Sequence, residues 1–306
     1  DGKTKDEVVD DIHSYQNEAD IPLLIGVDEE GGTVVRVSSN PNLRETPFLS
    51  PKDTYADGGW DAVKQDAEEK ADLLLSLGIN VNLAPVCDMT SDEYGFMYDR
   101  SFSSDVDMEN RYVRTVVETS KSKKLGTVLK HFPGYGNNSD THTGIAYDDR
   151  DYSEFENTDF KPFYQGIESG ADCILVSHNI VNCMDSEYPA SLSQKVHDIL
   201  RNEFKFDGVI MTDDLIMDAI TDFTGDEAAA VTAAKCGNDL LCCSSVNTQY
   251  PAVLEAVQNG EIPEAQVDAS VKRILKWKQN LGIFSIDTYQ KKVKSTEPTD
   301  TVGSEE

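Results

Sequence analysis

Short apolar runs that alternate with longer amphipathic stretches constrain the fold of this chain more than any other feature. Polarity does not alternate within these runs, which is typical of strands buried on both faces of a sheet. The runs cover residues 22–27, 79–86, 127–132, 173–178, 208–214 and 239–243. Repeated strand–helix units of this kind predict an α/β fold built on a parallel sheet.

The stretches between the runs have the spacing of amphipathic helices. Two of them are followed by Gly78 and Gly126, and glycine is common just after a helix. A helical crossover returns the chain to the start of the next parallel strand. The expected helices are 6–19, 60–77, 106–125, 159–169, 193–203, 226–236, 251–258 and 264–281.

Polar and charged residues follow most of the predicted strands. In a (β/α) barrel the carboxyl ends of the strands meet on one face, where active sites are built, whereas an open doubly wound sheet binds ligands at a switch point. Reactive side chains after five of the six runs favour a ring, and hence a (β/α)8 barrel of the TIM type. These residues are Asp28, Asp88, Lys130, His131, His178, Asp213 and Asp214.

Only six runs are found, so one or two leading strands of such a barrel are expected to be missing from this chain. Residues 1–290 are interpreted as a single catalytic domain that is incomplete at its N-terminus. The polar segment 291–306 is interpreted as a disordered tail, because it lacks the apolar residues that a packed core requires.

Composition narrows the possible partners. The formal net charge is −29, and such a surface repels nucleic acids and anionic membranes. No run of about 18 apolar residues is present, so no membrane span is expected. The six cysteines form no CxxC pair, which argues against a metal site built on them. The acidic charge and the start at Asp1 favour an extracellular or cell-surface location, the unpaired cysteines favour the cytoplasm, and the compartment stays open.

The segment KHFPGYGNNSDTH, residues 130–142, gathers several reactive side chains. Lys130 and His131 end a predicted strand, so at least one of them is expected to point into a site. The glycines that follow indicate a flexible loop. Asp140 and His142 lie two residues apart in that loop, and a carboxylate beside a histidine orients the ring and holds its proton. A chance Asp-x-His in a polar loop is the alternative interpretation.

Two further motifs place acids and arginines near strand ends. In VDEEGG, Asp28 is suited to accept hydrogen bonds from two vicinal hydroxyls, and the paired glycines let backbone approach a ligand closely. Arg36 follows a few residues later. In the second motif, Asp88 ends a strand and Arg100 lies in the loop beyond it, where it is suited to donate to hydroxyl or carbonyl oxygens. An acidic turn and a surface salt bridge are the respective alternatives.

The stretch TDDLIM places Asp213 and Asp214 directly after a strand. Adjacent carboxylates on an extended chain face opposite ways, so only one should enter the site. The other is then free to cap the next helix or to pair elsewhere. An ionised carboxylate at a barrel mouth can act as a nucleophile toward an anomeric carbon. A helix N-cap is the alternative interpretation.

In chain order, the motifs VDEEGG…R, NLAPVCD, RSF, KHFPG, DTH and TDDLIM resemble glycoside hydrolase family 3, in its β-N-acetylglucosaminidase branch. The resemblance runs from about residue 20 to about residue 245. It implies a (β/α)8 barrel whose first two strands precede the segment where this chain begins. It also implies an exo-acting, retaining enzyme that hydrolyses terminal, non-reducing N-acetylglucosamine from cell-wall fragments or chitin-type oligosaccharides.

The resemblance implies a role for each motif residue. Asp213 would be the nucleophile, and His142 would be the general acid/base with Asp140 as its partner. The partner molecule is a carbohydrate, and no cofactor or metal is implied. A zinc site from His131, Asp140 and His142 is disfavoured, because the hydrolase interpretation accounts for those residues without a metal. The implied sugar-binding residues are Asp28, Arg36, Arg100, Lys130 and His131, with Asp88 as a further contact to a hydroxyl.

Some features depart from the family pattern, and other interpretations stay open. Tyr135 and Glu29 stand where His and Gln are frequent, and the loop from Lys130 to His142 is about one residue shorter than in many relatives. The alternatives are a family 3 β-glucosidase, a phosphorolytic variant, and a non-catalytic sugar-binding module. A β-glucosidase of this family usually draws its acid/base from a second domain.

The remaining histidines say less about function. His13 and His197 fall in predicted helices and are expected to be solvated. His178 ends a predicted strand, where it either lines the site or makes a structural hydrogen bond.

Overall fold

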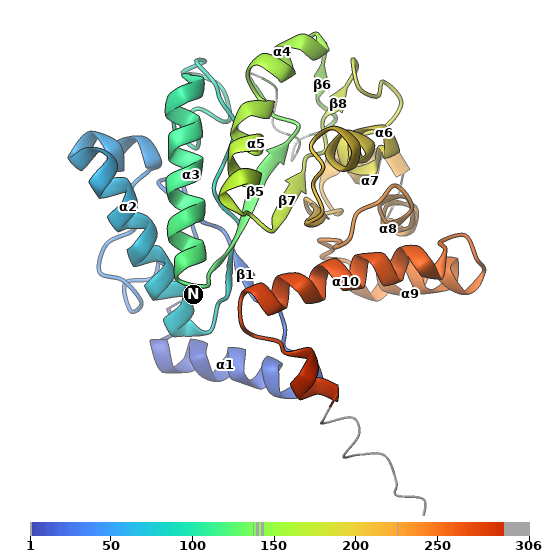
Figure 1. Ribbon diagram of the computed structural model, residues 1–306, viewed down its shortest axis with the longest axis horizontal. Coiled ribbons are helices and arrows are strands. Elements are labelled where there is room, and N and C mark those ends of the chain that lie inside the picture. The colour runs from blue at the N-terminus through green and yellow to red at the C-terminus, as the bar shows by residue number, and fades with distance from the viewer. Residues whose placement is uncertain (1, 137, 139–140, 142–143, 225, 291–306) are drawn as a thin grey trace, which may run out of the picture.

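The computed structural model describes residues 2–136, 138, 141, 144–224 and 226–290 (Figure 1). Two residues of the predicted loop dyad, Asp140 and His142, lie outside the described residues, as does the predicted tail 291–306. Within the described part of the chain, no helix is long and apolar enough to cross a membrane.

A curled sheet of five parallel strands forms the centre of the structure, and its strand order follows the chain order. A doubly wound sheet reverses its order at a switch point, so this simple succession is of the barrel kind. The expected α/β class with a parallel sheet is therefore confirmed as a half-barrel. The strands are β1 (Gly26–Val27), β4 (Val81–Asn82), β5 (Gly126–Phe132), β7 (Cys173–Val176) and β9 (Val209–Thr212).

Both faces of the sheet are buried, which explains why its strands read as continuous apolar runs. All residues of β5, β7 and β9 are buried. Successive residues point to opposite faces, so Val128 and Leu129 belong to different core clusters. On the first face, Leu129 packs in a cluster with residues of the surrounding helices. On the second face, Val128 packs with Trp277.

Helices connect the strands and cover the sheet, and α2, α3 and α5 pack side by side in Figure 1. Ser50 caps α2 by accepting a hydrogen bond from the backbone N–H of Asp53, and Pro51 occupies its first turn. The helix thus begins before the expected residue 60, and it is interrupted at Gly58 and Gly59. The α-helices are α1 (Lys5–Glu18), α2 (Pro51–Leu77), α3 (Val106–Ser122), α4 (Tyr152–Asn157), α5 (Phe160–Ser169), α6 (Gln194–Asp198), α7 (Asp218–Thr224), α8 (Asp226–Lys235), α9 (Val246–Gln258) and α10 (Glu264–Asn280).

Two short helices and two small sheets lie outside the central sheet and the α-helices. The 3-10 helix η2 and the π-helix η3 lie on either side of α6. One small antiparallel sheet pairs β2 with β3, and one small parallel sheet pairs β6 with β8. The bounds of these elements are β2 (Glu29–Gly31), β3 (Val34–Val35), β6 (Tyr147–Asp148), β8 (Ile180–Val181), η2 (Ala190–Leu192) and η3 (Ile199–Glu203).

Two expectations from the sequence are wrong in detail. The run 239–243 forms no ladder strand, because only Leu240 pairs with the sheet, through a single parallel bridge to Met211. His197 is buried rather than solvated, and its Nδ1 lies 2.7 Å from the carbonyl oxygen of Ser193. Burial lowers the pKa of His197, as desolvation of an imidazolium requires. His13 is exposed, as expected.

Helix α3 carries a carboxyl group that has no counter-ion among the described residues. Glu109 is fully buried, and Oε2 accepts a hydrogen bond of 2.9 Å from the backbone N–H of Ser103. Its Oε1 has no hydrogen-bond partner among the described residues. Burial raises the pKa of Glu109 well above its usual value, and the nearby Asp88 carboxylate raises it further.

This raised pKa makes stability pH-dependent in a defined sense. A carboxyl whose folded-state pKa is raised supports folding below its unfolded pKa and opposes it as the pH increases. Glu109→Gln removes the titrating carboxyl. We therefore expect the free energy of unfolding of the variant to exceed that of wild type by an amount that increases from pH 5 to pH 8. The expected gain is about 1–3 kcal/mol, the usual cost of an unpaired buried polar group. Urea unfolding at both pH values measures it, and a stability difference that does not change with pH would contradict the assignment.

Candidate active site

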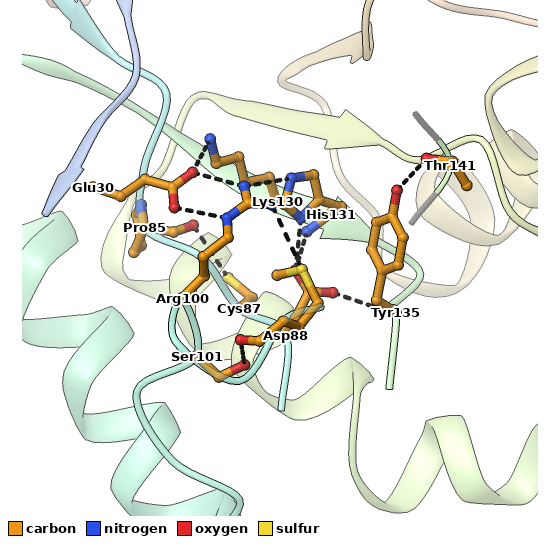
Figure 2. A network of polar contacts seen from close by, with 12 residues as sticks. Glu30, Pro85, Cys87, Asp88, Arg100, Ser101, Lys130, His131, Tyr135 and Thr141 are labelled. Atoms are coloured by element: carbon orange, nitrogen blue, oxygen red, sulfur yellow. Dashed lines mark hydrogen bonds and ion pairs between the residues drawn. The ribbon is translucent and has the colours of Figure 1, made fainter. Parts of the chain in front are cut away.

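The carboxyl ends of the parallel strands bring together most of the residues expected from the sequence. Asp28 follows β1, Lys130 and His131 lie at the end of β5, and Asp213 follows β9. Asp88 follows the run that continues β4, which pairs once more with β5 through a bridge from Val86 to Lys130. Figure 2 shows the side chains of Glu30, Asp88, Arg100, Lys130 and His131.

Lys130 is the most deeply buried cation of this group, with 3% of its side chain exposed. Its Nζ lies 2.6 Å from Asp28 Oδ1 and 2.6 Å from Glu30 Oε1. Burial alone would lower the pKa of Lys130, but the Glu30 and Asp28 carboxylates raise it above its usual value. The ammonium therefore stays charged inside the fold. Asp28 is a third exposed, so part of its carboxylate faces open space.

Glu30 joins two cations that come from different parts of the chain. Its carboxylate accepts two hydrogen bonds from Arg100, of 3.0 Å from Nε and 2.8 Å from Nη2, in addition to its contact with Lys130 (Figure 2). Burial alone would raise the pKa of Glu30, but Lys130 and Arg100 lower it to about 2. The site thus holds a permanently ionised carboxylate between two permanent cations.

Glu30 lies in the acidic run VDEEGG, and its role was not predicted from the sequence. The same run contains Glu29, which is also buried but turns the other way. Glu29 accepts hydrogen bonds from the backbone N–H groups of Arg36, Val37 and Ser38, and from the Ser38 hydroxyl. Successive side chains of β2 point to opposite faces. Glu29 therefore binds backbone N–H groups, whereas Glu30 binds the two cations of the site.

The paired glycines of this motif fit closely against the chain itself. Gly31 has a φ of 105°, and a Cβ there would lie 2.1 Å from the carbonyl oxygen of Leu49. Gly32 has a φ of 63°, and a Cβ there would lie 2.8 Å from the Cβ of Ser50. The absence of side chains at the two glycines thus lets the backbone of β2 lie close to residues 49–50. The sequence had suggested a close approach to a ligand.

Asp88 holds the ring of His131. Oδ2 of this fully buried carboxylate lies 2.7 Å from His131 Nδ1 and accepts the His131 backbone N–H at 3.0 Å, while Oδ1 accepts the Tyr135 backbone N–H at 2.7 Å. This placement differs from the expected contact to a sugar hydroxyl, because both oxygens are already engaged inside the protein. Asp88 therefore fixes the orientation of the His131 ring.

The partners of His131 fix its protonation state. A carboxylate only accepts hydrogen bonds, so Nδ1, which faces Asp88, carries the proton. Nε2 lies 3.2 Å from Arg100 Nη2, and a guanidinium only donates, so Nε2 is the acceptor. His131 is thus a neutral imidazole with a defined tautomer.

Asp213 and Asp214 have different hydrogen-bond partners. Asp213 is half-buried, and its Oδ1 accepts the Asp214 backbone N–H at 2.9 Å. Burial alone would raise the pKa of Asp213, but the hydrogen bond from the Asp214 backbone and the charge of Lys130 are among the causes that lower it below its usual value. Asp214 accepts hydrogen bonds from the hydroxyl and backbone N–H of Ser244.

Arg36 is not brought into contact with this group. Its side chain is exposed, and among the described residues it forms no hydrogen bond or ion pair. Its backbone is fixed, because its N–H donates to Glu29 Oε2 at 2.9 Å.

The loop after β5 is anchored at both described ends. The Tyr135 ring is buried and meets the His131 ring edge-on at 5.3 Å, and its hydroxyl bonds the hydroxyl of Thr141 (Figure 2). Thr141 lies between Asp140 and His142 in the sequence. The departure of this chain from the family pattern at Tyr135 thus lies at a contact between the two sides of the loop.

Packing also explains the loop glycines. A Cβ at Gly134 would lie 2.3 Å from Asp159 Oδ1, and a Cβ at Gly136 would lie 2.8 Å from Arg150 Cζ. Arg150 pairs with Asp148 and Asp159 and donates to the Gly134 carbonyl at 3.2 Å. The glycines that indicated a flexible loop instead allow its first part to pack tightly on this cluster.

Comparison with known proteins identifies the family. A model described as "Glycosyl hydrolase family 3 N terminal domain" matches residues 2–277. This chain belongs to glycosyl hydrolase family 3. The match confirms the family and the glycoside hydrolase class that the motifs predicted.

Two named relatives of this family 3 protein carry the name beta-hexosaminidase. The one from Hydrogenovibrio crunogenus is 34% identical over 252 residues, which cover 80% of this chain and 70% of the relative. Beta-hexosaminidase A from Pseudoalteromonas piscicida is 30% identical over 293 residues, covering 88% of this chain and 49% of the relative.

A solved structure supports the same fold. The family 3 beta-N-acetylglucosaminidase from Paenibacillus sp. str. FPU-7 superposes with a TM-score of 0.86 at 30% identity. The superposition covers 92% of this chain and 55% of the Paenibacillus chain. The family 3 protein described here thus spans about half the length of that structure.

The buried carboxylate of Glu30 gives this family 3 domain a testable pH dependence. Its depressed pKa stabilises the fold above pH about 4.5, and this contribution of about 3 kcal/mol is lost as the pH falls toward 2. Glu30→Gln leaves the buried Arg100 without its carboxylate partner and Lys130 with Asp28 alone, so we expect a loss of about 3–5 kcal/mol at pH 7. The variant should also lack the wild-type decline of stability between pH 5 and pH 2, as measured by urea unfolding.

Glu29→Gln is the matched control, because Glu29 faces backbone N–H groups and no cation. We expect it to lose less stability and to keep the decline at low pH. Equal behaviour of the two variants would contradict the role of Glu30.

Proposed function

We propose that this family 3 protein is an exo-acting, retaining β-N-acetylglucosaminidase that hydrolyses terminal N-acetylglucosamine from cell-wall fragments or chitin-type oligosaccharides. The observation that carries the proposal is the ionised Asp213 beside the fixed cations and imidazole at the ends of the strands. The names of the most similar relatives support the choice of sugar. The five-stranded half-barrel is proposed to be part of a (β/α)8 barrel.

Sugar binding is assigned to the polar rim that surrounds Asp213. Asp28 offers carboxylate oxygen to sugar hydroxyls, since a third of its side chain is exposed. Lys130 and Arg100 donate from positions that Glu30 fixes. His131 presents its Nε2 edge beside Arg100. Arg36 is proposed to reach the sugar from its anchored backbone.

The first chemical step is attack by Asp213 on the anomeric carbon. The carbon–oxygen bond to the leaving group breaks, and His142 donates a proton to the departing oxygen. Asp213 must be ionised to attack, and its lowered pKa keeps it so through the neutral range. The product of this step is a covalent glycosyl-enzyme.

In the second step His142, now neutral, takes a proton from water, which attacks the same carbon and releases Asp213. Asp140 is proposed to orient the His142 ring and to favour its protonated form. A histidine in this role avoids a second carboxylate beside Asp213, because two like charges in one site raise the pKa of one of them. Retention follows from the two successive displacements.

Removal of the nucleophile tests the proposal directly. Asp213→Asn should lower the release of an aryl group from its β-N-acetylglucosaminide by at least about 10³-fold, as expected when a nucleophile is removed. Asp214→Asn is the matched control and should lose no more than about tenfold, because that side chain faces Ser244. The wild-type protein should turn over the matching β-glucoside far more slowly. Equal turnover of both sugars, or an active Asp213→Asn variant, would contradict the assignment.

Removal of the acid/base should depend on the leaving group. His142→Ala should slow hydrolysis of an oligosaccharide by about 10²–10⁴-fold, because its alcohol leaving group needs a proton. An aryl glycoside with an acidic leaving group should lose much less. His13→Ala is the control, since His13 is exposed on α1. A His142→Ala variant that is equally impaired on both substrates would count against the general-acid role.

A further inference from the structure

His178 is a fully buried histidine beside the proposed nucleophile, and the mechanism above gives it no role. It lies two residues beyond the end of β7, next to β9, in parallel register. Its Nδ1 lies 2.7 Å from Ser191 Oγ, and its Nε2 lies 3.0 Å from the carbonyl oxygen of Asp214. The ring therefore contacts the backbone one residue beyond Asp213.

The partners of His178 specify how the ring is oriented. A backbone carbonyl only accepts hydrogen bonds, so Nε2 carries a proton and donates a hydrogen bond to the carbonyl of Asp214. In the neutral ring Nδ1 is then an acceptor, which the Ser191 hydroxyl satisfies. Ser191 thus holds the Nδ1 edge of the ring, and the Nε2 edge binds the backbone carbonyl of Asp214.

Ser191 is itself held firmly. It lies in η2 and is fully buried. Its backbone N–H donates a hydrogen bond of 2.9 Å to the Ser177 carbonyl. Its own carbonyl accepts a hydrogen bond of 2.8 Å from Asn238 Nδ2. The hydroxyl that meets His178 therefore comes from a segment tied to the strand that carries His178.

The backbone around Asp213 is fixed from two sides by the neighbouring strand. Its N–H donates to the Val176 carbonyl at 3.2 Å, and the next carbonyl, that of Asp214, accepts from His178. Both anchors come from the end of β7 and the residues just beyond it. The Asp213 carboxylate is in turn held by backbone, because its Oδ1 accepts the Asp214 N–H at 2.9 Å.

We infer that His178 is a positioning residue that holds Asp213 in the direction needed for attack, by donating from Nε2 to the Asp214 carbonyl. The inference rests on the proposed function, in which Asp213 is the nucleophile. Attack requires the carboxylate within a narrow range of positions, and a shift of about 1 Å can cost about 10²-fold in rate.

Two substitutions separate the two contacts of the ring. The amide nitrogen of Gln reaches the place of Nε2, so His178→Gln keeps the donor to Asp214. The shorter Asn reaches only the place of Nδ1, so His178→Asn keeps the contact with Ser191 and loses the donor. Both are neutral amides, and both remove the ring, so they control for each other.

The experiment measures turnover and product binding with the full chain. We expect His178→Asn to lower kcat on an aryl β-N-acetylglucosaminide by about 10- to 100-fold, and His178→Gln to stay within about fivefold of wild type. Both variants should bind N-acetylglucosamine with a Kd within about threefold of wild type, by calorimetry, because Asp28, Lys130 and Arg100 remain in place. The loss in the Asn variant should be the same for good and poor leaving groups, since the nucleophile acts on both.

Several results would overturn the inference. A His178→Asn variant with wild-type kcat would show that Asp213 needs no such support. Equal losses of kcat and product binding in both variants would indicate a purely structural role. These outcomes presuppose an active wild type that Asp213→Asn inactivates, and a wild type that releases no sugar would overturn the proposed function and this role with it.

Discussion

The ion pairs of Glu30 with Lys130 and Arg100 are the interaction on which the rest of the site depends. The three residues come from β2, β5 and the loop beyond β4, so one carboxylate ties together segments far apart in the sequence. Removing the Glu30 carboxylate would leave the buried Arg100 guanidinium without its anion, which is costly in free energy. The positions of Asp28 and His131 follow from this arrangement, because each contacts one of the two cations.

Much of this arrangement could be predicted from the sequence, and the reasons are physical. Strands buried on both faces must be apolar throughout, so β5, β7 and β9 were recognisable as runs. The end of a run marks the edge of the sheet, so residues placed there, such as Asp213, were expected to gather. The run 239–243 was wrongly predicted to be a strand. It joins the sheet only at Leu240, and an apolar stretch of this length can also be a segment that packs against a sheet.

Other features could not be predicted, since they depend on which partners a side chain meets. Glu29 and Glu30 are identical neighbours in the sequence, and only the register of β2 decides that one faces backbone N–H groups and the other faces cations. Asp88 stands at a strand end like Asp28, yet its oxygens are taken by His131 and Tyr135. Glycines in a loop suggest freedom, but Gly134 and Gly136 mark the places where Arg150 and Asp159 leave no room.

The neutral state of His131 has a consequence for how tasks are divided within the domain. Asp88 on one edge and Arg100 on the other hold the ring in one protonation state, while Glu30, Asp213 and Lys130 have pKa values displaced away from neutrality. These ion pairs and hydrogen bonds fix the charges on this side of the candidate site. Under the proposed function the same groups would recognise the sugar and proton transfer would fall to the loop histidine, so recognition and proton transfer would be carried by separate parts of the domain.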